Sequence, residues 1–348
     1  MTVRGELAAG AASARTLDVH AHVVLEETLG AAGAHGPELG EDDAGRPWFR
    51  VGGYCLHGVR YRGGPFMDVG ARLAAMERAA LDFQVLSPNP LTYFHFVGAD
   101  DAVAFCRRHN DALAALVRRH PERLAGFAAL PMQHVAAACD ELERAVGELG
   151  LLGAYAGTDF GTPLDADRLD PLYEKLVALD VPLFLHPAPH GIDGPPADPR
   201  LARFDLELIV GFATDETIAV ATLVYGGVLE RHPRLDVCVS HGGGAAPFLA
   251  GRLGAATRKR AWAPASLRAD GAFEEALGRL WFDVHVHDSR ALRLLAELAG
   301  TERLVLGTNF AGWDQGGALD LGELAPTLAA NARRLLRLTA PPSLEAHA

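Results

Sequence analysis

Two histidines separated by one residue end the first apolar run of the chain, which reads Asp18-Val19-His20-Ala21-His22. In a β-strand, residues i and i+2 point to the same face, so both imidazoles face one way. Two imidazole nitrogens on one side of a strand end can chelate a divalent metal ion. This pattern alone also leaves open a pair of packed or hydrogen-bonded structural histidines.

Three later apolar runs also end in polar side chains. His186 ends the run FLH, His241 ends the run VSH, and Asn309 follows the run LGT. The C-terminal ends of parallel strands meet on one side of a barrel, so these side chains are expected to share a cavity with the first two histidines. One strand-end histidine is usually structural, but four histidines at three strand ends are difficult to explain by packing alone.

The order of elements predicts an α/β fold, a (β/α)₈ TIM barrel. Short apolar runs alternate with longer segments of helical spacing, which indicates a parallel sheet with helical crossovers. Eight such units favour a closed barrel, and the 348 residues suffice for a fold that needs about 250. The predicted strands are 16–24, 83–88, 124–131, 151–157, 181–186, 235–241, 280–287 and 303–308, and the predicted helices lie near 69–81, 100–119, 134–148, 167–179, 216–231, 245–259, 289–299 and 319–337.

Two segments fall outside this alternation. Residues 25–67 are glycine-rich with short aromatic runs, and we expect an insertion after the first strand that forms a small β-subdomain over the barrel mouth. Residues 187–215 begin with a Pro/Gly-rich stretch after the fifth strand and are expected at the same face. Residues 16–340 are thus expected to form one barrel domain, between a flexible leader over 1–15 and a tail over 341–348.

Composition excludes several classes of protein. Apolar residues make up 49% of the chain and charged residues 22%, which argues against a disordered protein. The formal net charge of −12 makes nucleic acid and anionic membranes unfavourable partners. No stretch approaches 18 uninterrupted apolar residues, so no membrane-spanning helix is expected. The four scattered cysteines, without a CxxC pair, fit free thiols in the cytoplasm.

These motifs resemble the decarboxylase branch of the amidohydrolase superfamily, which includes the aminocarboxymuconate-semialdehyde decarboxylases. The resemblance covers nearly the whole chain and rests on DVHAH, LPMQ, FLHP, YGGVLERHPRLDVCVSHGGGAAPF and LGTNF. It implies that His20, His22 and His186 bind one divalent metal ion, Zn²⁺ or alternatively Mn²⁺. It also implies that His241 is the catalytic histidine beside the metal. The implied reaction is decarboxylation of a small unsaturated or aromatic carboxylic acid.

The same resemblance implies two arginines that bind substrate. Arg252, on the helix that follows His241, corresponds to an arginine that reaches into the neighbouring subunit's site and holds a substrate carboxylate. Arg60, in the insertion, corresponds to a second carboxylate-binding arginine, with Arg62 as the alternative. Guanidinium groups suit bidentate binding of carboxylates. The resemblance therefore implies a small-molecule carboxylate substrate and a homodimer.

One position departs from the resemblance. The relatives have Asp in a GTD sequence at the end of the eighth strand, where this chain has Asn309. In the relatives this Asp is a metal ligand and an acid–base group, whereas an amide is a weak neutral ligand and cannot act as a base. The sequence therefore predicts weaker metal binding, with Asn309 still in the catalytic and metal site. Asp314 could replace the lost carboxylate if the following loop folds back.

The seventh strand carries a second HxH pair, His285 and His287, with Asp283 on the same face. The resemblance offers no counterpart for His285, which is expected to line the substrate pocket or to supply a replacement base. A barrel-interior histidine with a local hydrogen bond is the alternative. Two other functions also stay open, namely a metal-dependent hydrolase or hydratase of a similar substrate, and a metal-free atypical relative, which Asn309 favours.

Overall fold

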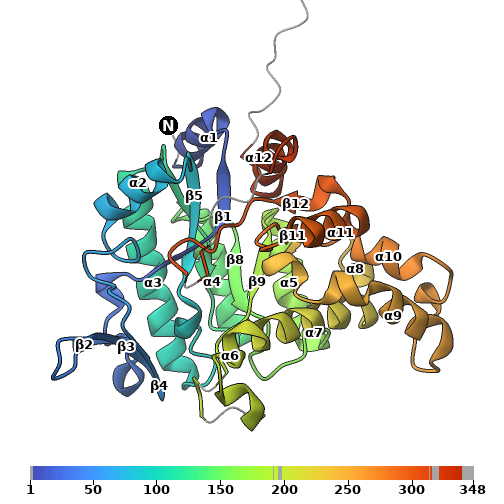
Figure 1. Cartoon of the computed structure of the whole chain (residues 1–348), viewed down its shortest axis with the longest axis horizontal. Helices are drawn as coiled ribbons and strands as arrows, with labels where there is room; N and C mark the ends of the chain where they lie inside the picture. The colour runs from blue at the N-terminus through green and yellow to red at the C-terminus, as the bar shows by residue number, and fades with distance from the viewer. Residues whose placement is uncertain (1–2, 191, 195–197, 313, 316–320, 339–348) are drawn as a thin grey trace, which may run out of the picture.

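Buried apolar runs form the strands of one parallel barrel in the computed structural model, which describes residues 3–190, 192–194, 198–312, 314–315 and 321–338 (Figure 1). The first two strands are buried along their whole length, as expected where a sheet is covered on both faces. The third strand is divided into two segments around Phe127. The barrel strands are β1 (Leu17–Val23), β5 (Phe83–Pro88), β6 (Leu124–Gly126), β7 (Ala128–Ala129), β8 (Ala154–Gly157), β9 (Leu183–His186), β10 (Val237–Val239), β11 (Trp281–Asp283) and β12 (Leu304–Val305).

The first and last strands close the barrel. All strand pairs from β5 to β12 are parallel, in the order of the chain. β12 is short, but the chain around it runs beside β1, with parallel bridges from Asp18 to Leu306 and from Ala21 to Phe310. The (β/α)₈ barrel predicted from the sequence is confirmed, and its C-terminal strand ends meet at one face.

Amphipathic helices cover the outside of the barrel. α3 (Ala99–Arg119) buries Phe105, Leu113 and Val117 and contacts β6 and β7. The short helix α10 was not predicted. The predicted start of the last helix near residue 319 lies outside the described residues, and the predicted tail over 341–348 lies outside them as well. The remaining long crossover helices are α2 (Val69–Arg78), α4 (Val135–Gly147), α5 (Asp170–Leu179), α7 (Gly211–Tyr225), α9 (Ala246–Lys259), α11 (Ser289–Ala299) and α12 (Leu324–Leu335), and the short ones are α6 (Leu206–Ile209), α8 (Val228–Arg231) and α10 (Ala272–Leu277).

The insertion after β1 contains a small antiparallel sheet with its own core, as the sequence predicts. Its strands pair in the order β2-β3-β4, and Figure 1 shows them apart from the barrel strands, at the end opposite to α1 and α12. Phe49 stacks on Tyr61 with ring centroids 4.4 Å apart, and Tyr61 stacks on Phe66 at 4.6 Å. The same core includes Leu91, Phe94 and Phe105 from outside the insertion, so the subdomain packs against the barrel. Its strands are β2 (Glu38–Glu41), β3 (Pro47–Val51) and β4 (Tyr54–His57).

The N-terminal segment corrects one expectation. The sequence predicts a flexible leader over residues 1–15, but the structure contains a helix there, α1 (Val3–Ser13). Leu7 and Ala11, one helical turn apart, are fully buried in the main core. Arg333 of α12 donates hydrogen bonds to carbonyl groups at the end of α1. The prediction was wrong because an alanine-rich segment has high helix propensity, and its few apolar side chains suffice to dock it.

The helical segment Leu206–Tyr225, formed by α6 and α7, is long and apolar enough to cross a membrane. Its Glu216 is fully buried, and α7 contacts β9 and α9. A helix that buries a carboxylate against the strand ends of a barrel is a crossover helix of that barrel. Apolar side chains on its outer side remain exposed.

Candidate metal centre and active site

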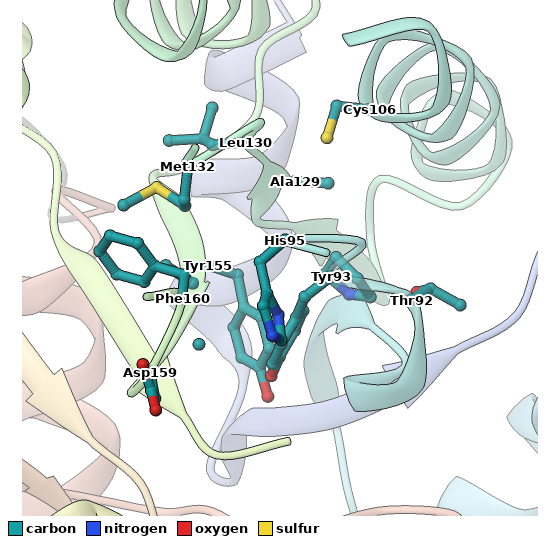
Figure 2. A pocket seen from close by; sticks show the side chains of 13 residues that line it. Thr92, Tyr93, His95, Cys106, Ala129, Leu130, Met132, Tyr155, Asp159 and Phe160 are labelled. Carbon is teal, nitrogen blue, oxygen red and sulfur yellow. The ribbon is translucent and has the colours of Figure 1, made fainter. Parts of the chain in front are cut away.

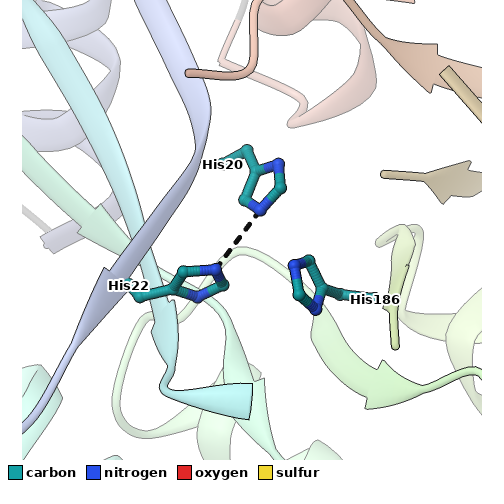
Figure 3. Close-up of side chains that lie close together, drawn as sticks. All are labelled: His20, His22 and His186. Carbon is teal, nitrogen blue, oxygen red and sulfur yellow. Dashed lines mark hydrogen bonds between the residues drawn. The ribbon is translucent and has the colours of Figure 1, made fainter. Parts of the chain in front are cut away.

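Three histidine side chains, which we call the strand-one cluster, meet at the C-terminal face of the barrel. His20 and His22 lie in β1, His186 is the last residue of β9, and all three are buried. Their ring centroids lie 4.8–5.1 Å apart, and Figure 3 shows the rings facing a common point. The structure therefore brings together the three residues that the sequence predicts as metal ligands.

Hydrogen bonds turn the same nitrogen of each ring away from the common point. His20 Nδ1 lies 2.7 Å from the carboxylate of Asp283 in β11, the strand on the far side of β12 from β1. The Nδ1 atoms of the other rings lie near backbone carbonyls, at 3.3 Å for His22 and 2.6 Å for His186. An oxygen partner keeps the proton on Nδ1, so each Nε2 presents a lone pair inward. His186 Nε2 is buried and has no hydrogen-bond partner among the described residues.

The strand-one cluster is neutral near pH 7. Burial lowers the pKa of His22 to about 3, and burial together with neighbouring histidines lowers the pKa of His20 and His186 well below the usual range. His20 Nε2 and His22 Nε2 lie 3.3 Å apart. Two nitrogens that each bind a tetrahedral zinc ion at about 2.0–2.1 Å lie about 3.3–3.4 Å apart. Converging lone pairs repel one another, so the donor set fits a divalent cation such as Zn²⁺ or Mn²⁺.

Asn309 adds a neutral oxygen beside this cluster. It follows β12 with a left-handed backbone (φ 48°), and its Oδ1 is buried without a hydrogen-bond partner among the described residues. Its Nδ2 donates to Asp314 Oδ1 at 2.5 Å, which fixes the amide orientation. Asn309 lines the same cavity as His22 and His186. This oxygen without a hydrogen-bond partner fits the role of a weak fourth ligand to an ion.

His241 lies next to the strand-one cluster and holds a proton. Its ring centroid is 5.0 Å from His20 and 4.9 Å from His186. Its Nδ1 lies 2.6 Å from Glu216, a buried carboxylate of α7 that also accepts a hydrogen bond from Ser240. Burial lowers the pKa of His241, but the charge and hydrogen bond of Glu216 outweigh it and raise the pKa to about 9. Since Glu216 occupies Nδ1, Nε2 is the nitrogen left for a reacting group.

His241 also belongs to a second group, the strand-seven cluster of His241, His285 and Asp314. One donor atom from each of these residues lies within 4.8 Å of the other two. His285 is buried, its ring centroid lies 5.4 Å from that of His241, and its Nε2 lies 3.1 Å from Asp314 Oδ2. The loop after β12 thus folds back as one of the sequence alternatives required. It places Asp314 beside His285 and Asn309.

Two carboxylates that the sequence reasoning did not assign to the site organise both clusters. Asp283 accepts from His20 and from the backbone N–H of His285, and Glu216 orients His241. The signal for Asp283 was present, because it precedes an HxH pair by two residues, as Asp18 does in β1. Glu216 had no comparable signal beyond its position as an acid in an apolar helix.

A third buried carboxylate, Asp18, lies in β1 itself and links this strand to its neighbours. Asp18 accepts from the Gln84 amide at 2.9 Å and from the Thr308 hydroxyl at 2.7 Å. Burial raises its pKa to about 6, although these hydrogen bonds partly oppose that rise. The buried Arg72 donates to Gln84 and to the carbonyl of His22. This network fixes the strand that carries the first two histidines.

A cavity of about 260 Å³ opens over the strand-one cluster, between the barrel mouth and the insertion. None of its lining residues, within the described chain, is Lys, Arg, Asp or Glu. The space is smaller than the roughly 300–1,000 Å³ of sites for drug-sized ligands, so it suits a small molecule. The polar lining consists of His22, Asn89, His186 and Asn309, and the aromatic lining consists of Tyr54, Tyr61, Phe66 and Phe212.

The structure does not bring the predicted arginines to this cavity within one chain. Arg60 points outward, with its side chain 66% exposed and 3.8 Å from Glu41. The alternative, Arg62, pairs with Glu26 on the surface. Arg252 is exposed on α9. The substrate-binding roles of Arg60 and Arg252 therefore stay predictions, and His285 lies in the strand-seven cluster rather than in the lining of this cavity.

A second, much smaller chamber has a volume of about 10 Å³, and Figure 2 shows the side chains that line it. Tyr93 and Tyr155 line it, and Tyr155 also stacks on His186 with ring centroids 5.9 Å apart. The hydroxyl of Tyr155 is buried without a hydrogen-bond partner among the described residues. A chamber of this size holds about one water molecule. It is therefore part of the packing that supports His186.

Comparisons with known proteins agree with this geometry. The family model described as amidohydrolase matches residues 17–342. The chain is 33% identical to 2-amino-3-carboxymuconate-6-semialdehyde decarboxylase of Dictyostelium discoideum, over 74% of this chain and 69% of that protein. It is 31% identical to gamma-resorcylate decarboxylase of Rhizobium radiobacter, over 65% of this chain and 68% of that protein.

Solved structures support the fold. A dihydroxybenzoic acid decarboxylase from Polaromonas sp. JS666, solved with bound manganese and the inhibitor 2-nitroresorcinol, superimposes with a TM-score of 0.70. The alignment covers 95% of this chain and 99% of that chain at 22% sequence identity. Similarity at this level of identity establishes the shared barrel.

Proposed function

The chain belongs to the amidohydrolase family, and from that premise we propose that it is a metal-dependent decarboxylase, a carbon–carbon lyase of small aromatic or unsaturated carboxylic acids. One observation carries the proposal. His241, which holds a proton on Glu216, stands beside three converging neutral histidines, two of which, His22 and His186, line an apolar cavity. The decarboxylases among its relatives support the same reaction class.

The arrangement suits the chemistry of decarboxylation. The reaction breaks the bond between carbon and the carboxyl group, releases CO₂ and places a proton on that carbon. His241 supplies this proton from Nε2, while Glu216 stabilises the charged imidazolium before the transfer. A divalent ion held by His20, His22 and His186 would polarise substrate oxygens. The apolar walls exclude water from the carbon that receives the proton.

The lining of the cavity favours an aromatic acid with a single carboxylate. Tyr54, Tyr61 and Phe212 provide flat apolar surface, and no cationic side chain of the described chain faces the cavity. A second carboxylate on the substrate would be buried without a partner, which is costly. Within one chain, the metal site and His241 are the groups that can balance the negative charge of the reacting carboxylate. For the groups of a single chain, a benzoate-like substrate therefore fits better than a muconate-like dicarboxylate.

Zn²⁺ is the ion that we propose for the strand-one cluster. Three neutral imidazoles with oxygen-anchored Nδ1 atoms form a donor set that zinc commonly uses in catalytic sites. Mn²⁺ is the alternative, because the Polaromonas relative contains manganese. Metal analysis by mass spectrometry of protein purified without chelators distinguishes the two ions. A protein that turns over its substrate after complete metal removal would instead be the metal-free relative.

A homodimer is the proposed assembly, in the cytoplasm. Phe248 on α9 is 81% exposed, and Ile209 and Ile218 on the neighbouring helices are more than half exposed. Arg252 lies four residues after Phe248, so both share one face of α9. A two-fold contact through this face would bury the apolar side chains and bring Arg252 toward the partner copy. Light scattering that finds a fully active monomer would overturn this assembly.

The reaction is tested with a panel of hydroxylated benzoic acids, including 2,6-dihydroxybenzoate, and with the metal-loaded protein. We expect release of CO₂ and formation of the corresponding phenol, and we expect both to be lost in His241→Asn and after metal removal. His57→Asn, which changes an exposed histidine of the insertion, is the matched control. A hydrated or hydrolysed product without CO₂ would place the protein among the hydratases or hydrolases of the family instead.

A further inference from the structure

The strand-seven cluster contains more metal-binding chemistry than a proton-transfer histidine requires. His285 Nε2 and Asp314 Oδ2 lie 3.1 Å apart, and one donor atom of His241 lies within 4.8 Å of both residues. All three side chains are at least partly buried, and they come from different strand ends. The proposed reaction uses His241 and leaves the other two without a function.

We propose that the strand-seven cluster is a second divalent-cation site, formed by His241, His285 and Asp314 beside the strand-one cluster. Two imidazoles and one carboxylate are ligands that Zn²⁺, Mn²⁺ and Co²⁺ share. Two donor atoms that each lie about 2.1 Å from an ion at octahedral or tetrahedral angles are separated by about 3.0–3.4 Å. The 3.1 Å between His285 and Asp314 matches that separation without rearrangement.

The strand-seven cluster resembles the strand-one cluster in the carboxylates that hydrogen-bond to its histidines. His20 is oriented by a buried carboxylate on Nδ1, Asp283, and His241 is oriented in the same way by Glu216. Such carboxylate–histidine pairs fix the ring and leave Nε2 as the ligand. Asp283 joins both clusters, because one of its oxygens accepts from His20 and the other accepts from the backbone of His285. The second cluster is thus constructed like a metal site.

The Asp314 carboxylate provides the charge that the strand-one cluster lacks. Asp314 Oδ2 lies 3.1 Å from His285 Nε2 and 3.4 Å from His287 Nε2, and its Oδ1 accepts from the amide of Asn309. An ionised carboxylate strengthens binding of a dication. Asn309 connects the clusters by donating to Asp314 while its own oxygen remains beside His22.

Occupancy of the second site would have a consequence that rests on the proposed function. To bind at His241 Nε2, an ion must displace the proton that this nitrogen otherwise delivers, which also makes the second site the weaker one. Activity is then expected to rise as the strand-one cluster fills and to fall at higher metal concentration as the strand-seven cluster fills. The second ion would act as an inhibitor of the decarboxylase.

Titration of the metal-free full chain with Mn²⁺ tests the proposal, by calorimetry and by electron paramagnetic resonance. We expect two ions per chain, with the second bound more weakly, and a spin-coupled spectrum at full occupancy because the clusters are adjacent. His285→Gln should bind one ion with an uncoupled spectrum. His22→Gln should lose the tighter ion and keep the weaker one. The control His57→Gln should bind two ions, as the native chain does.

Asp314→Asn removes a different ligand of the same ion. It therefore tests the site independently if His285→Gln fails to fold. It should lower the affinity for the second ion by about 10–100-fold or more. A native chain that binds a single ion, or a second ion that persists unchanged in both variants, would overturn the proposal. Two ions in a chain that never releases CO₂ would support the second site and remove the proposed function, so the two failures are distinguishable.

Discussion

The pattern Asp-Val-His-x-His occurs twice, at Asp18–His22 and at Asp283–His287, with different outcomes. In both copies the Asp Oδ1 accepts from the backbone N–H two residues later, at 3.1 Å. β1 continues through its copy and buries both histidines, whereas β11 ends at Asp283 and leaves the His287 side chain 57% exposed. Local sequence therefore sets the Asp–His geometry, and the neighbouring strands decide whether a closed site forms.

This difference separates two kinds of site. The strand-one cluster is fully buried, neutral and formed by strand residues, so it is organised for an ion before the ion arrives. The strand-seven cluster is less completely buried, with Asp314 15% exposed, and it depends on this carboxylate from a loop. It also shares its first residue, His241, with the proposed chemistry. The two clusters are thus expected to differ in metal affinity and in their response to mutation.

The largest expected effect separates chemistry from metal binding. His241→Asn should lower kcat by about 10²–10⁴-fold, the usual contribution of a general acid or base. Binding of the tighter ion should be unchanged, because the strand-one cluster keeps all its ligands. Steady-state kinetics and metal titration of the same preparation measure both quantities. If turnover survives the change, His241 is not the proton donor, and the two clusters do not have the separate roles proposed here.

The next effect concerns pH. The pKa of His241 is raised to about 9, so the histidine keeps its proton up to that pH and loses it above. Glu216→Gln removes the charge that raises this pKa, which should then fall to its ordinary value of about 6.5 or below. At pH 9 the variant should retain roughly one hundredth of the native activity. A pH–rate profile with an unchanged basic limb would contradict the role of Glu216.

A third experiment moves the carboxylate from one cluster to the other. Asn309→Asp alone adds charge beside the strand-one ion but places a second carboxylate against Asp314, 2.5 Å from the present amide nitrogen. The exchange of both residues, Asn309→Asp with Asp314→Asn, avoids that repulsion. It should tighten the first ion by about tenfold or more and weaken the second. Equal or weaker binding of the first ion would exclude the electrostatic explanation.

The smallest effect uses a buried histidine that belongs to neither cluster. Burial lowers the pKa of His109 in α3 to about 4, below its unfolded value of about 6.5. Below pH 6.5 the unfolded chain binds a proton that the folded chain does not, so stability is lost as pH falls toward 4. At pH 5.5 this loss is about 1.4 kcal/mol.

Urea unfolding of the metal-free protein at pH 7 and pH 5.5 measures this loss. His109→Gln should lose less stability than the native chain over that interval, by about 1.2 kcal/mol, because about 0.2 kcal/mol is already lost at pH 7. Equal losses in the two proteins would mean that the acid sensitivity arises in the histidine clusters alone.

The sequence predicted the parts of the site that follow from strand periodicity. His20, His22 and His186 could be assigned because strand ends of a parallel barrel converge, and His241 followed from its motif. Asp283 and Glu216 were missed because their partners lie far away in the chain and their distances depend on the closed barrel. The fold was predictable from alternation, and the exceptions were the helix at the N-terminus and the short helices α6 and α10.

The position of Asp314 required the structure. A loop of irregular conformation follows Asn309, whose backbone is left-handed, and no periodicity specifies where such a loop leads. The sequence left open whether Asp314 reaches the site, and the structure places it there. The structure of one chain does not test the predicted roles of the surface arginines in the same way. The proposed role of Arg252 requires a second chain.

Closure of the barrel between the first strand and the last has a consequence during synthesis. The backbone N–H of Thr308 donates to Asp18, 290 residues earlier in the chain. One edge of β1 therefore stays unpaired until nearly the whole protein has left the ribosome. An open edge of apolar parallel strand invites aggregation, and long-range closure is slow. Asp283 and Asn309 also emerge late. Neither cluster can therefore capture an ion in its final geometry before translation is almost complete.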